Sequence, residues 1–175
     1  MNRIILLVVV LACYTFSACA QTGTPVSLKL PSGFKAIVVA EKLSRARHIA
    51  VHTNGDVYVK LERLRDGKGI IRLRDTNGDG VADEQFAFGN YGGTGIAISN
   101  GYLYASSDDE VFRYKFNNKN EIENPDAPEK IVTGLVNKRQ HASKSITLDG
   151  KGFIYVNIGA PSNACQEQDR TAGSP

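Results

Sequence analysis

Three segments of the chain share one pattern of hydrophobic and polar positions. Each has a short strand in which apolar and polar residues alternate, then a turn rich in Asn, Asp and Gly, then a strand rich in Val, Ile and Tyr. The segments are IAVHTNGDVYV from Ile49, IAISNGYLYAS from Ile96 and ITLDGKGFIYVNI from Ile146. Alternation around Asn-Gly or Asp-Gly is typical of β-hairpins. The pattern therefore predicts three hairpins, with turns at Asn54-Gly55, Asn100-Gly101 and Asp149-Gly150.

Further strand-like segments follow the hairpins in a constant order. GIIRLRD from Gly69 and EVFRYKF from Glu110 come after the first and second hairpins, and EQFAFG and EKIVTGL extend the two units. The hairpins start 47 and 50 residues apart. A repeat of about 50 residues with about four strands is typical of a β-propeller blade. A β-sandwich with accidental similarity among its strands is the alternative.

The repeat predicts an all-β chain that holds only part of a propeller. Closure of the ring takes about 4–8 blades, whereas residues 30–175 contain about two and a half. The open edges of such a segment would leave backbone groups unpaired. We therefore expect residues 30–175 to be the N-terminal part of a propeller domain in a larger protein.

The first 20 residues are typical of an export signal. MNR gives a positive start, and the apolar run IILLVVVLA is too short for a permanent membrane span. Ala18-Cys19-Ala20 fits the pattern that signal peptidase cleaves, whereas Phe16-Ser17-Ala18-Cys19 is a loose lipobox that would place a lipid anchor on Cys19. An uncleaved anchor helix is a third interpretation. We expect residues 1–20 to be a signal peptide, residues 21–29 a linker, and the protein periplasmic or anchored facing outward.

Composition narrows the class of protein further. Hydrophobic residues make up 42% of the chain and charged residues 22%, as in globular proteins. A net charge of +3 is too small to favour binding to nucleic acid or to a membrane surface. Beyond the leader only Cys165 remains, and a single cysteine is unusual in an oxidising compartment. Either its thiol is buried or its partner lies beyond Pro175, and we favour the second interpretation.

The segment DTNGDGVADE offers a candidate metal loop. Its oxygen-bearing side chains occupy positions 1, 3, 5 and 9 of an EF-hand-type calcium loop. They are Asp75, Asn77, Asp79 and Asp83. The twelfth position is Phe86 instead of glutamate, and no helix is predicted on either side. Both a structural calcium loop and a plain polar hairpin tip remain open, since Asp, Asn and Gly also favour turns.

His141 is the candidate for catalysis. It stands five residues before Ile146, in the loop that leads into the first strand of the third unit. That strand would line the channel of a propeller, and a loop before it would open on one face of the channel. An imidazole there can act as a general base because it titrates near neutral pH. A surface or structural histidine is the alternative. His48 has a similar setting beside Arg47, and His52 is expected to be structural.

The sequence lacks the motifs of several other kinds of functional site. The sequence contains no CxxCH for haem attachment, no GxxxxGK phosphate loop and no GxSxG elbow. The glycine-rich run of residues 92–95 is expected to be a flexible connection between blades rather than a nucleotide loop.

Three longer stretches together resemble the sorbosone dehydrogenase family. They are LPSGFKAIVVAEKLSRARHIAV, GIIRLRDTNGDGVADE and HASKSITLDGKGFIYVNIGAPSNACQEQD. This family is grouped with aldose and pyranose dehydrogenases that use pyrroloquinoline quinone. The resemblance covers the chain from about residue 26 and implies a six-bladed propeller. It also implies a quinone bound over the channel, a calcium ion beneath its carbonyls, and oxidation of an aldose or sugar aldehyde.

The resemblance gives His141 a role. In these enzymes a histidine before an inner strand takes the proton of the sugar hydroxyl, while a hydride passes to the quinone. Lys144 stands where related sequences often have arginine, so a bidentate contact would be lost. The resemblance places the groups that bind the quinone and the catalytic calcium in later blades. It implies an electron acceptor such as a cytochrome c or a quinone.

Two other functions remain open at this point. The first is a non-catalytic propeller that serves as a binding module, because this fold hosts many functions. The second is a lactone-hydrolysing propeller that uses calcium without a quinone. If the full-length protein is a quinone-dependent dehydrogenase, we expect residues 1–175 alone to be inactive.

Overall fold

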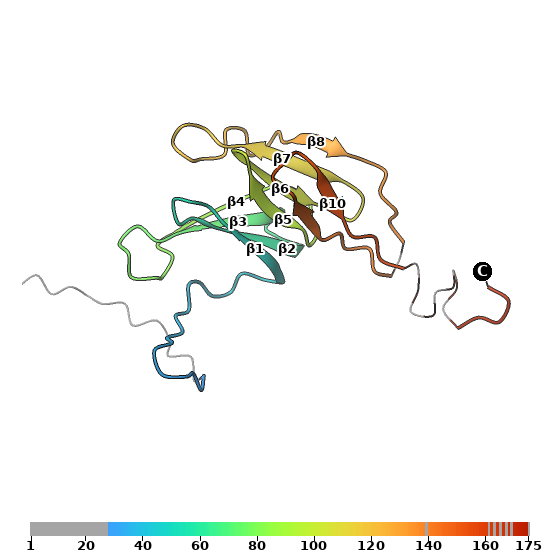
Figure 1. Ribbon diagram of the computed structural model, residues 1–175, viewed down its shortest axis with the longest axis horizontal. Helices are drawn as coiled ribbons and strands as arrows, with labels where there is room; N and C mark the ends of the chain where they lie inside the picture. The colour runs from blue at the N-terminus through green and yellow to red at the C-terminus, as the bar shows by residue number, and fades with distance from the viewer. Residues whose placement is uncertain are drawn as a thin grey trace, which may run out of the picture.

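The computed structural model describes residues 28–138, 140–160, 162, 164, 166, 168 and 170–174. The signal peptide predicted at residues 1–20, most of the linker at 21–29, Cys19 and Cys165 lie outside the described residues. In the described part of the chain every regular element is a β-strand (Figure 1), which confirms the all-β prediction. No helix in this part is long and apolar enough to cross a membrane.

The strands form two complete four-stranded sheets and the start of a third. The first sheet contains β1 (Ala46–Val51), β2 (Val57–Arg65), β3 (Lys68–Arg74) and β4 (Glu84–Phe88). The second contains β5 (Ile96–Ser99), β6 (Tyr102–Ser106), β7 (Val111–Lys115) and β8 (Glu129–Val132). The third is the hairpin of β9 (Ile146–Leu148) and β10 (Ile154–Val156). Within each sheet, every strand pairs antiparallel with the next along the chain, as expected for about two and a half blades.

The first strands of successive blades lie next to one another. β1 contacts β5, and β5 contacts β9, whereas the outer strands β4 and β8 lie at the far side of each sheet. This is the arrangement of a propeller, in which the innermost strands surround a channel. Because the strands alternate in direction, the beginnings of β1, β5 and β9 share one face of the molecule. The connection between β3 and β4 lies on the opposite face (Figure 1).

The three predicted turns take two forms. Asn100 and Gly101 form a two-residue turn between paired Ser99 and Tyr102, both with positive φ (49° and 78°), as their sequence predicts. The first hairpin instead has a five-residue loop, because pairing ends at Val51 and Val57. The third hairpin also has a longer loop, between paired Leu148 and Ile154. Side-chain oxygens stabilise both longer loops: those of Asn54 and Asp149 accept backbone N–H groups within them.

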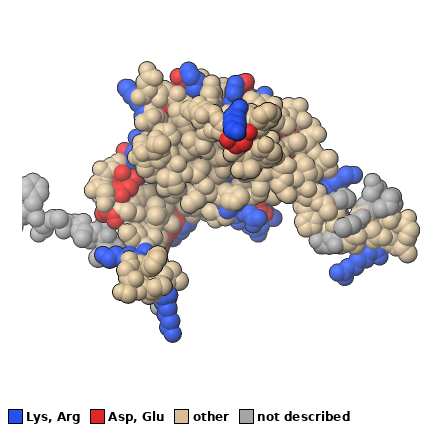
Figure 2. Space-filling model, in the orientation of Figure 1, with Lys and Arg blue, Asp and Glu red and all other residues tan. Residues whose placement is uncertain are grey.

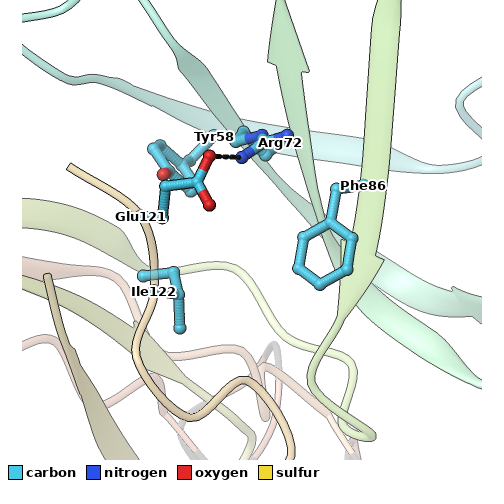
Figure 3. A pocket seen from close by; sticks show the side chains of 5 residues that line it. All are labelled: Tyr58, Arg72, Phe86, Glu121 and Ile122. Atoms are coloured by element: carbon cyan, nitrogen blue, oxygen red, sulfur yellow. Dashed lines mark hydrogen bonds and ion pairs between the residues drawn. The ribbon is translucent and has the colours of Figure 1, made fainter. Parts of the chain in front are cut away.

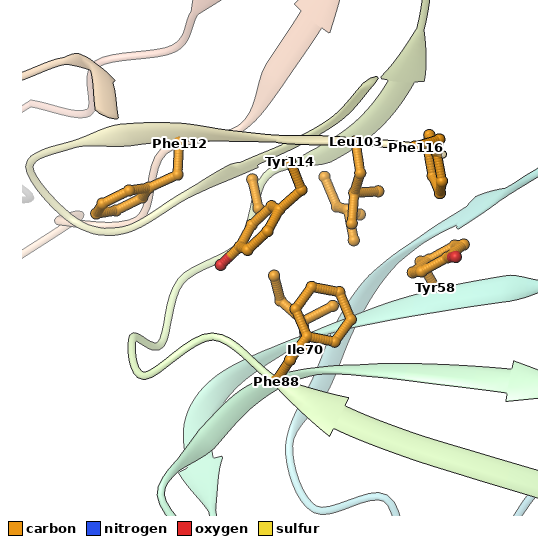
Figure 4. Close-up of a cluster of buried hydrophobic side chains, with 9 residues drawn as sticks. Tyr58, Ile70, Phe88, Leu103, Phe112, Tyr114 and Phe116 are labelled. Atoms are coloured by element: carbon orange, nitrogen blue, oxygen red, sulfur yellow. The ribbon is translucent and has the colours of Figure 1, made fainter. Parts of the chain in front are cut away.

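The main core lies between the first two blades. Tyr58, Ile70 and Phe88 of the first sheet pack against residues of the second sheet (Figure 4). The partners from the second blade are Leu103, Phe112 and Tyr114 of the sheet and Phe116, which directly follows β7. The rings of Phe88 and Tyr114 meet edge to face, with centroids 5.1 Å apart, a geometry worth about 0.5–1.5 kcal/mol beyond burial. This packing fixes the angle between the two blades.

The two central strands of the first sheet, β2 and β3, are covered on both faces. Successive residues of a strand point to opposite faces, so Tyr58 faces the second blade and Val59 the other side. There Val59, Leu61, Ile71 and Leu73 form a second cluster. Ala40 and Leu43, from the segment before β1, pack against it. The consecutive apolar residues of β2 and β3 therefore reflect strands that are buried on both faces.

The glycine run at residues 92–95 passes tightly between the blades. The N–H of Gly93 donates to the carbonyl of Leu61 at 3.0 Å. A Cβ atom on Gly93 would lie 2.2 Å from the carbonyl oxygen of Ser106, and its φ is 149°. The run connects two blades as predicted, but close backbone approach, rather than flexibility, explains the glycine.

Candidate functional site

His141 is exposed on the segment between β8 and β9, with a φ of 52°. It lines a cavity of about 430 Å³. The other lining residues are mostly polar and come from all three blades. They are Arg47, Thr94, Ser143, Ser145, Asn157, Gly159 and Ala160.

The topology brings these residues together. Arg47 lies near the start of β1, Thr94 just before β5, and Ser145 just before β9, while Asn157 follows β10. Antiparallel pairing places all of these positions on the same face, around the ends of the inner strands. The cavity thus has a guanidinium, several hydroxyls, an amide and an imidazole around one opening. Such a set can hydrogen-bond a polar ligand and transfer a proton.

The segment that carries His141 is held by buried polar groups. Lys144 is fully buried, and its ammonium donates a hydrogen bond to the carbonyl of Ala142. The hydroxyl of Ser106 donates to the carbonyl oxygen of Lys144 at 2.5 Å. The N–H of Asn157 donates to the carbonyl of Ser145 at 3.0 Å. The loop before β9 is therefore fixed to both neighbouring elements.

The other two histidines have different settings. Nδ1 of His48 lies 3.1 Å from the carbonyl oxygen of Thr94, so this exposed ring joins the first blade to the second. His52 is buried in the first hairpin, where its Nδ1 lies 2.8 Å from the amide oxygen of Asn54. Its ring also packs on Phe116, with centroids 4.5 Å apart. The structural role predicted for His52 agrees with this packing.

The predicted calcium residues all lie in the loop that connects β3 and β4. The carboxylate of Asp75 accepts hydrogen bonds from backbone N–H groups, including Gly80 and Gly78 at 2.7 Å each. Asp83 accepts from the N–H and the hydroxyl of Thr76. These bonds lower the pKa of both carboxyls. Asn77 and Asp79 accept from backbone N–H groups in the same way.

This loop lies far from the His141 cavity. Acidic side chains gather at the left of Figure 2, where Figure 1 places the connection between β3 and β4, on the face opposite to the β8–β9 segment. Among the residues that the structure describes, no group of three or more His, Cys, Asp or Glu side chains is arranged to hold a metal ion. Calcium binding by Asp75, Asn77, Asp79 and Asp83 stays a prediction.

A second, smaller cavity of about 160 Å³ lies between the first two blades (Figure 3). Its polar lining is an ion-pair network: Arg72 donates to Glu121 at 3.3 Å, and Tyr58 lies beside them. Burial and the nearby Asp56 raise the pKa of Tyr58 to about 12. The opposite charges here pair with one another, so this cavity connects the blades and offers less to a ligand than the His141 cavity.

The same network contains an ion pair that the sequence did not reveal. Arg74 makes a bidentate contact with the buried carboxylate of Asp56, with distances of 2.7 and 2.6 Å. Burial alone would raise the pKa of Asp56, but the hydrogen bonds from Arg74 and Asn54 outweigh it and lower that pKa. A charged residue next to a hairpin turn gave no signal of burial, because the covering residues come from elsewhere in the chain.

Sequence reasoning also missed Lys60, which is fully buried between the blades. Its ammonium donates to the carbonyl oxygen of Tyr91 at 2.6 Å and lies 4.2 Å from the centre of that ring. Burial lowers its pKa to about 7. Its position in the sequence could have predicted this burial. Lys60 comes two residues after Tyr58, so both side chains point to the same side of a strand whose other neighbours are apolar.

Comparisons with known proteins agree on this fold. The family described as TrAA12-like matches residues 28–174. The holo form of the pyranose dehydrogenase PQQ domain from Coprinopsis cinerea is 19% identical, with a TM-score of 0.62 over 76% of this chain and 32% of that one. The calcium structure of the family AA12 enzyme from Trichoderma reesei is 23% identical, with a TM-score of 0.58 over 71% of this chain and 32% of that one.

This chain therefore spans about a third of the length of these solved relatives. At such identities the likeness establishes the fold, a partial β-propeller, and confirms that prediction. No curated protein matches the sequence.

Proposed function

Since the chain belongs to the TrAA12-like family, we propose that it is part of an exported, quinone-dependent sugar dehydrogenase that oxidises an aldose or sugar aldehyde. The family assignment agrees with the resemblance to sorbosone and pyranose dehydrogenases. The observation that carries the proposal is the position of His141 in a polar cavity built from three blades. The names of the relatives support the proposed cofactor, since one is a holo PQQ domain.

The described residues suit one side of an anionic quinone. Pyrroloquinoline quinone carries carboxylates and carbonyl oxygens, which accept hydrogen bonds. Arg47, Ser145 and Asn157 supply donors at the cavity. Arg47 pairs with Glu62 at 3.7 Å and remains half exposed, so further N–H groups can reach a carboxylate. The cavity volume of about 430 Å³ falls in the usual range for small-molecule sites, about 300–1,000 Å³.

A calcium ion at the reacting centre does not fit the described residues. None of the described carboxylates lines the His141 cavity. No suitable group of three or more His, Cys, Asp or Glu side chains occurs elsewhere in this part of the chain either. We propose that other parts of the protein supply the ligands for that ion. The role of His141 does not depend on it.

His141 would act as the general base. When bound, the quinone supplies the acceptor for the two electrons that leave the sugar carbon with its hydrogen. The imidazole takes the proton of the hydroxyl on that same carbon, so that a C=O double bond forms and the proton stays on the ring nitrogen. Arg47 and the cavity hydroxyls would orient the ligands. A positioned base contributes about 10²–10⁴ in rate.

The test uses the full-length protein with quinone, calcium, an aldose and a dye that accepts electrons. We expect His141→Ala to reduce dye reduction by about 10²–10⁴-fold. His48→Asn is the matched control, because it removes an exposed imidazole outside the cavity lining while its amide N–H can still donate to the carbonyl of Thr94, and we expect it to keep most of the activity.

Two outcomes would support the rival functions. A full-length protein that never binds the quinone would indicate a non-catalytic binding module. Hydrolysis of lactones without any redox cofactor would indicate a lactonase. Full dye reduction by His141→Ala would contradict the role of His141 directly.

Export is the second part of the proposal. It rests on the positive start, apolar run and cleavage patterns of residues 1–20. The protein would then act in the periplasm or on an outward-facing membrane, with a cytochrome c or a quinone as electron acceptor. Mass spectrometry of the mature N-terminus distinguishes cleavage after Ala20 from a lipid anchor on Cys19.

A further inference from the structure

We propose that Ser106 is a positioning residue for His141. It holds the loop before β9 in the place where the imidazole faces the cavity. The inference rests on the proposed function, because positioning matters only if His141 acts as a base. Ser106 itself does not line the cavity, so its effect would pass through the loop.

The hydroxyl of Ser106 joins two segments that are far apart in sequence. It is fully buried at the end of β6. It donates to the carbonyl oxygen of Lys144 at 2.5 Å and accepts from the N–H of Gly95 at 2.9 Å. One side chain therefore fixes both the start of the second blade and the loop that leads into the third. The buried site excludes water that could replace these bonds.

The side chain of Lys144 reaches back to the residue next to His141. The ammonium of Lys144 donates a hydrogen bond to the carbonyl of Ala142, the residue after His141. This bond closes the segment from Ala142 to Lys144, directly next to His141, on itself. A hydrogen bond that fixes the carbonyl of Lys144 therefore also restrains the backbone next to His141.

Gly159 supports the loop from the other side. A Cβ atom on Gly159 would lie 2.5 Å from Cβ of His141 and 2.6 Å from its carbonyl oxygen. The absence of a side chain thus lets the backbone of His141 lie directly against the segment after β10. With Ser106 on one side and Gly159 on the other, the loop has little freedom to shift.

Such restraint matters for proton transfer. A general base has to lie within about 2.6–3.2 Å of the proton donor's heavy atom. A displacement of about 1 Å can reduce the rate by about 100-fold. Removal of the Ser106 hydroxyl would leave the Lys144 carbonyl and the Gly95 N–H without their partner, and the loop would shift to find others.

The experiment compares Ser106→Ala with Ser107→Ala in the full-length protein loaded with quinone and calcium. Ser107 is the matched control: its hydroxyl bonds only within the β6–β7 turn, to Asp109 and to the N–H of Glu110. For Ser106→Ala we expect kcat to fall at least about tenfold with KM within about twofold of wild type. For Ser107→Ala we expect both values to stay within about twofold.

A second readout needs no quinone. Diethyl pyrocarbonate modifies exposed imidazoles, and mass spectrometry gives the rate at each histidine. We expect Ser106→Ala to change the rate at His141 by at least about threefold, and Ser107→Ala to leave that rate within about twofold of wild type. If Ser106→Ala fails to fold, Ser106→Cys takes its place, because it keeps the shape with a much weaker donor.

The outcomes separate this inference from the proposed function. An active His141→Ala variant contradicts the proposed function, whatever Ser106 does. Loss of activity in His141→Ala together with wild-type kcat and modification rate in Ser106→Ala overturns the positioning role alone. A tenfold loss in Ser107→Ala as well would also overturn it, because the effect would then be general.

Discussion

At the scale of single residues, burial changes the chemistry of Lys60. Its ammonium bonds to the backbone carbonyls of Tyr91 and Gly69. Burial lowers its pKa to about 7, whereas a lysine in an unfolded chain titrates near 10.4. Between these two pH values the unfolded chain holds a proton that the folded chain has lost. Raising the pH through this window therefore favours the folded state.

We predict that Lys60→Met removes this pH dependence. The methionine variant should exceed wild type in free energy of unfolding near pH 7, by an amount on the order of a few kcal/mol, and the gap should shrink towards pH 9.5. Urea unfolding of both proteins at several pH values measures the gap. The upper limit lies below about pH 10, where tyrosines of the unfolded chain begin to ionise, whereas burial raises the pKa of Tyr58 and Tyr114 in the folded chain to about 12. A gap that stays constant with pH would contradict the prediction.

At the scale of elements, the loop between β3 and β4 pairs its backbone N–H groups with side-chain oxygens of the same loop. Asp75 accepts three backbone N–H groups of its own loop. Asp83 binds Thr76 and the side chain of Asn77. The loop is thus ordered by internal hydrogen bonds, and it also presents the oxygens that calcium prefers.

We predict that calcium stabilises this loop, and that Asp79→Asn weakens the response. The asparagine keeps an oxygen to accept the N–H of Val81, which Asp79 bonds at 2.8 Å, but it removes one negative charge. Thermal unfolding with chelator and with millimolar calcium should show a rise of a few degrees in wild type, because a ligand that binds only the folded state stabilises it.

The corresponding rise in Asp79→Asn should be at most about half as large, since ligand charge sets much of the affinity for calcium. Asp126→Asn is the control for a lost charge, because Asp126 is an exposed partner of Lys68 on another loop. If calcium does not raise the unfolding temperature of wild type, the prediction is wrong and the loop is a plain polar hairpin tip.

At the scale of the whole molecule, the described residues expose apolar side chains on both outer blades. Ile49 and Val51 of β1 are 62% and 59% exposed. On the third hairpin, Phe153 and Tyr155 are 67% and 57% exposed. The first two blades bury such residues against each other. In a closed ring, the remaining blades would cover these two surfaces in the same way.

We predict that the 175-residue chain alone shows no dye reduction and associates with itself. Sedimentation should give species larger than the 19.0 kDa monomer, because exposed apolar edges favour pairing between chains. Tyr155→Lys should shift the distribution towards monomer, whereas Lys151→Arg, which keeps the charge in the same exposed hairpin, should not. A monomeric chain that reduces the dye would contradict both parts.

The sequence by itself determined the hairpins, the two and a half blades and the position of His141 before an inner strand. These features follow from local rules: a period of two sets the strands, and Asn, Asp and Gly set the turns. The same local rules left the lengths of the first and third hairpin loops open, because side chains such as Asn54 and Asp149 complete those loops.

Only the tertiary structure decided which polar residues are buried and which groups they hydrogen-bond. Lys60, Asp56 and Ser106 look like ordinary strand or turn residues in the sequence, yet each is buried by segments from another part of the chain. Ser106 and Lys144 are 38 residues apart, and no local pattern links them. The packing of one blade on the next creates such contacts. The same packing places His141 in one cavity with polar residues of all three blades.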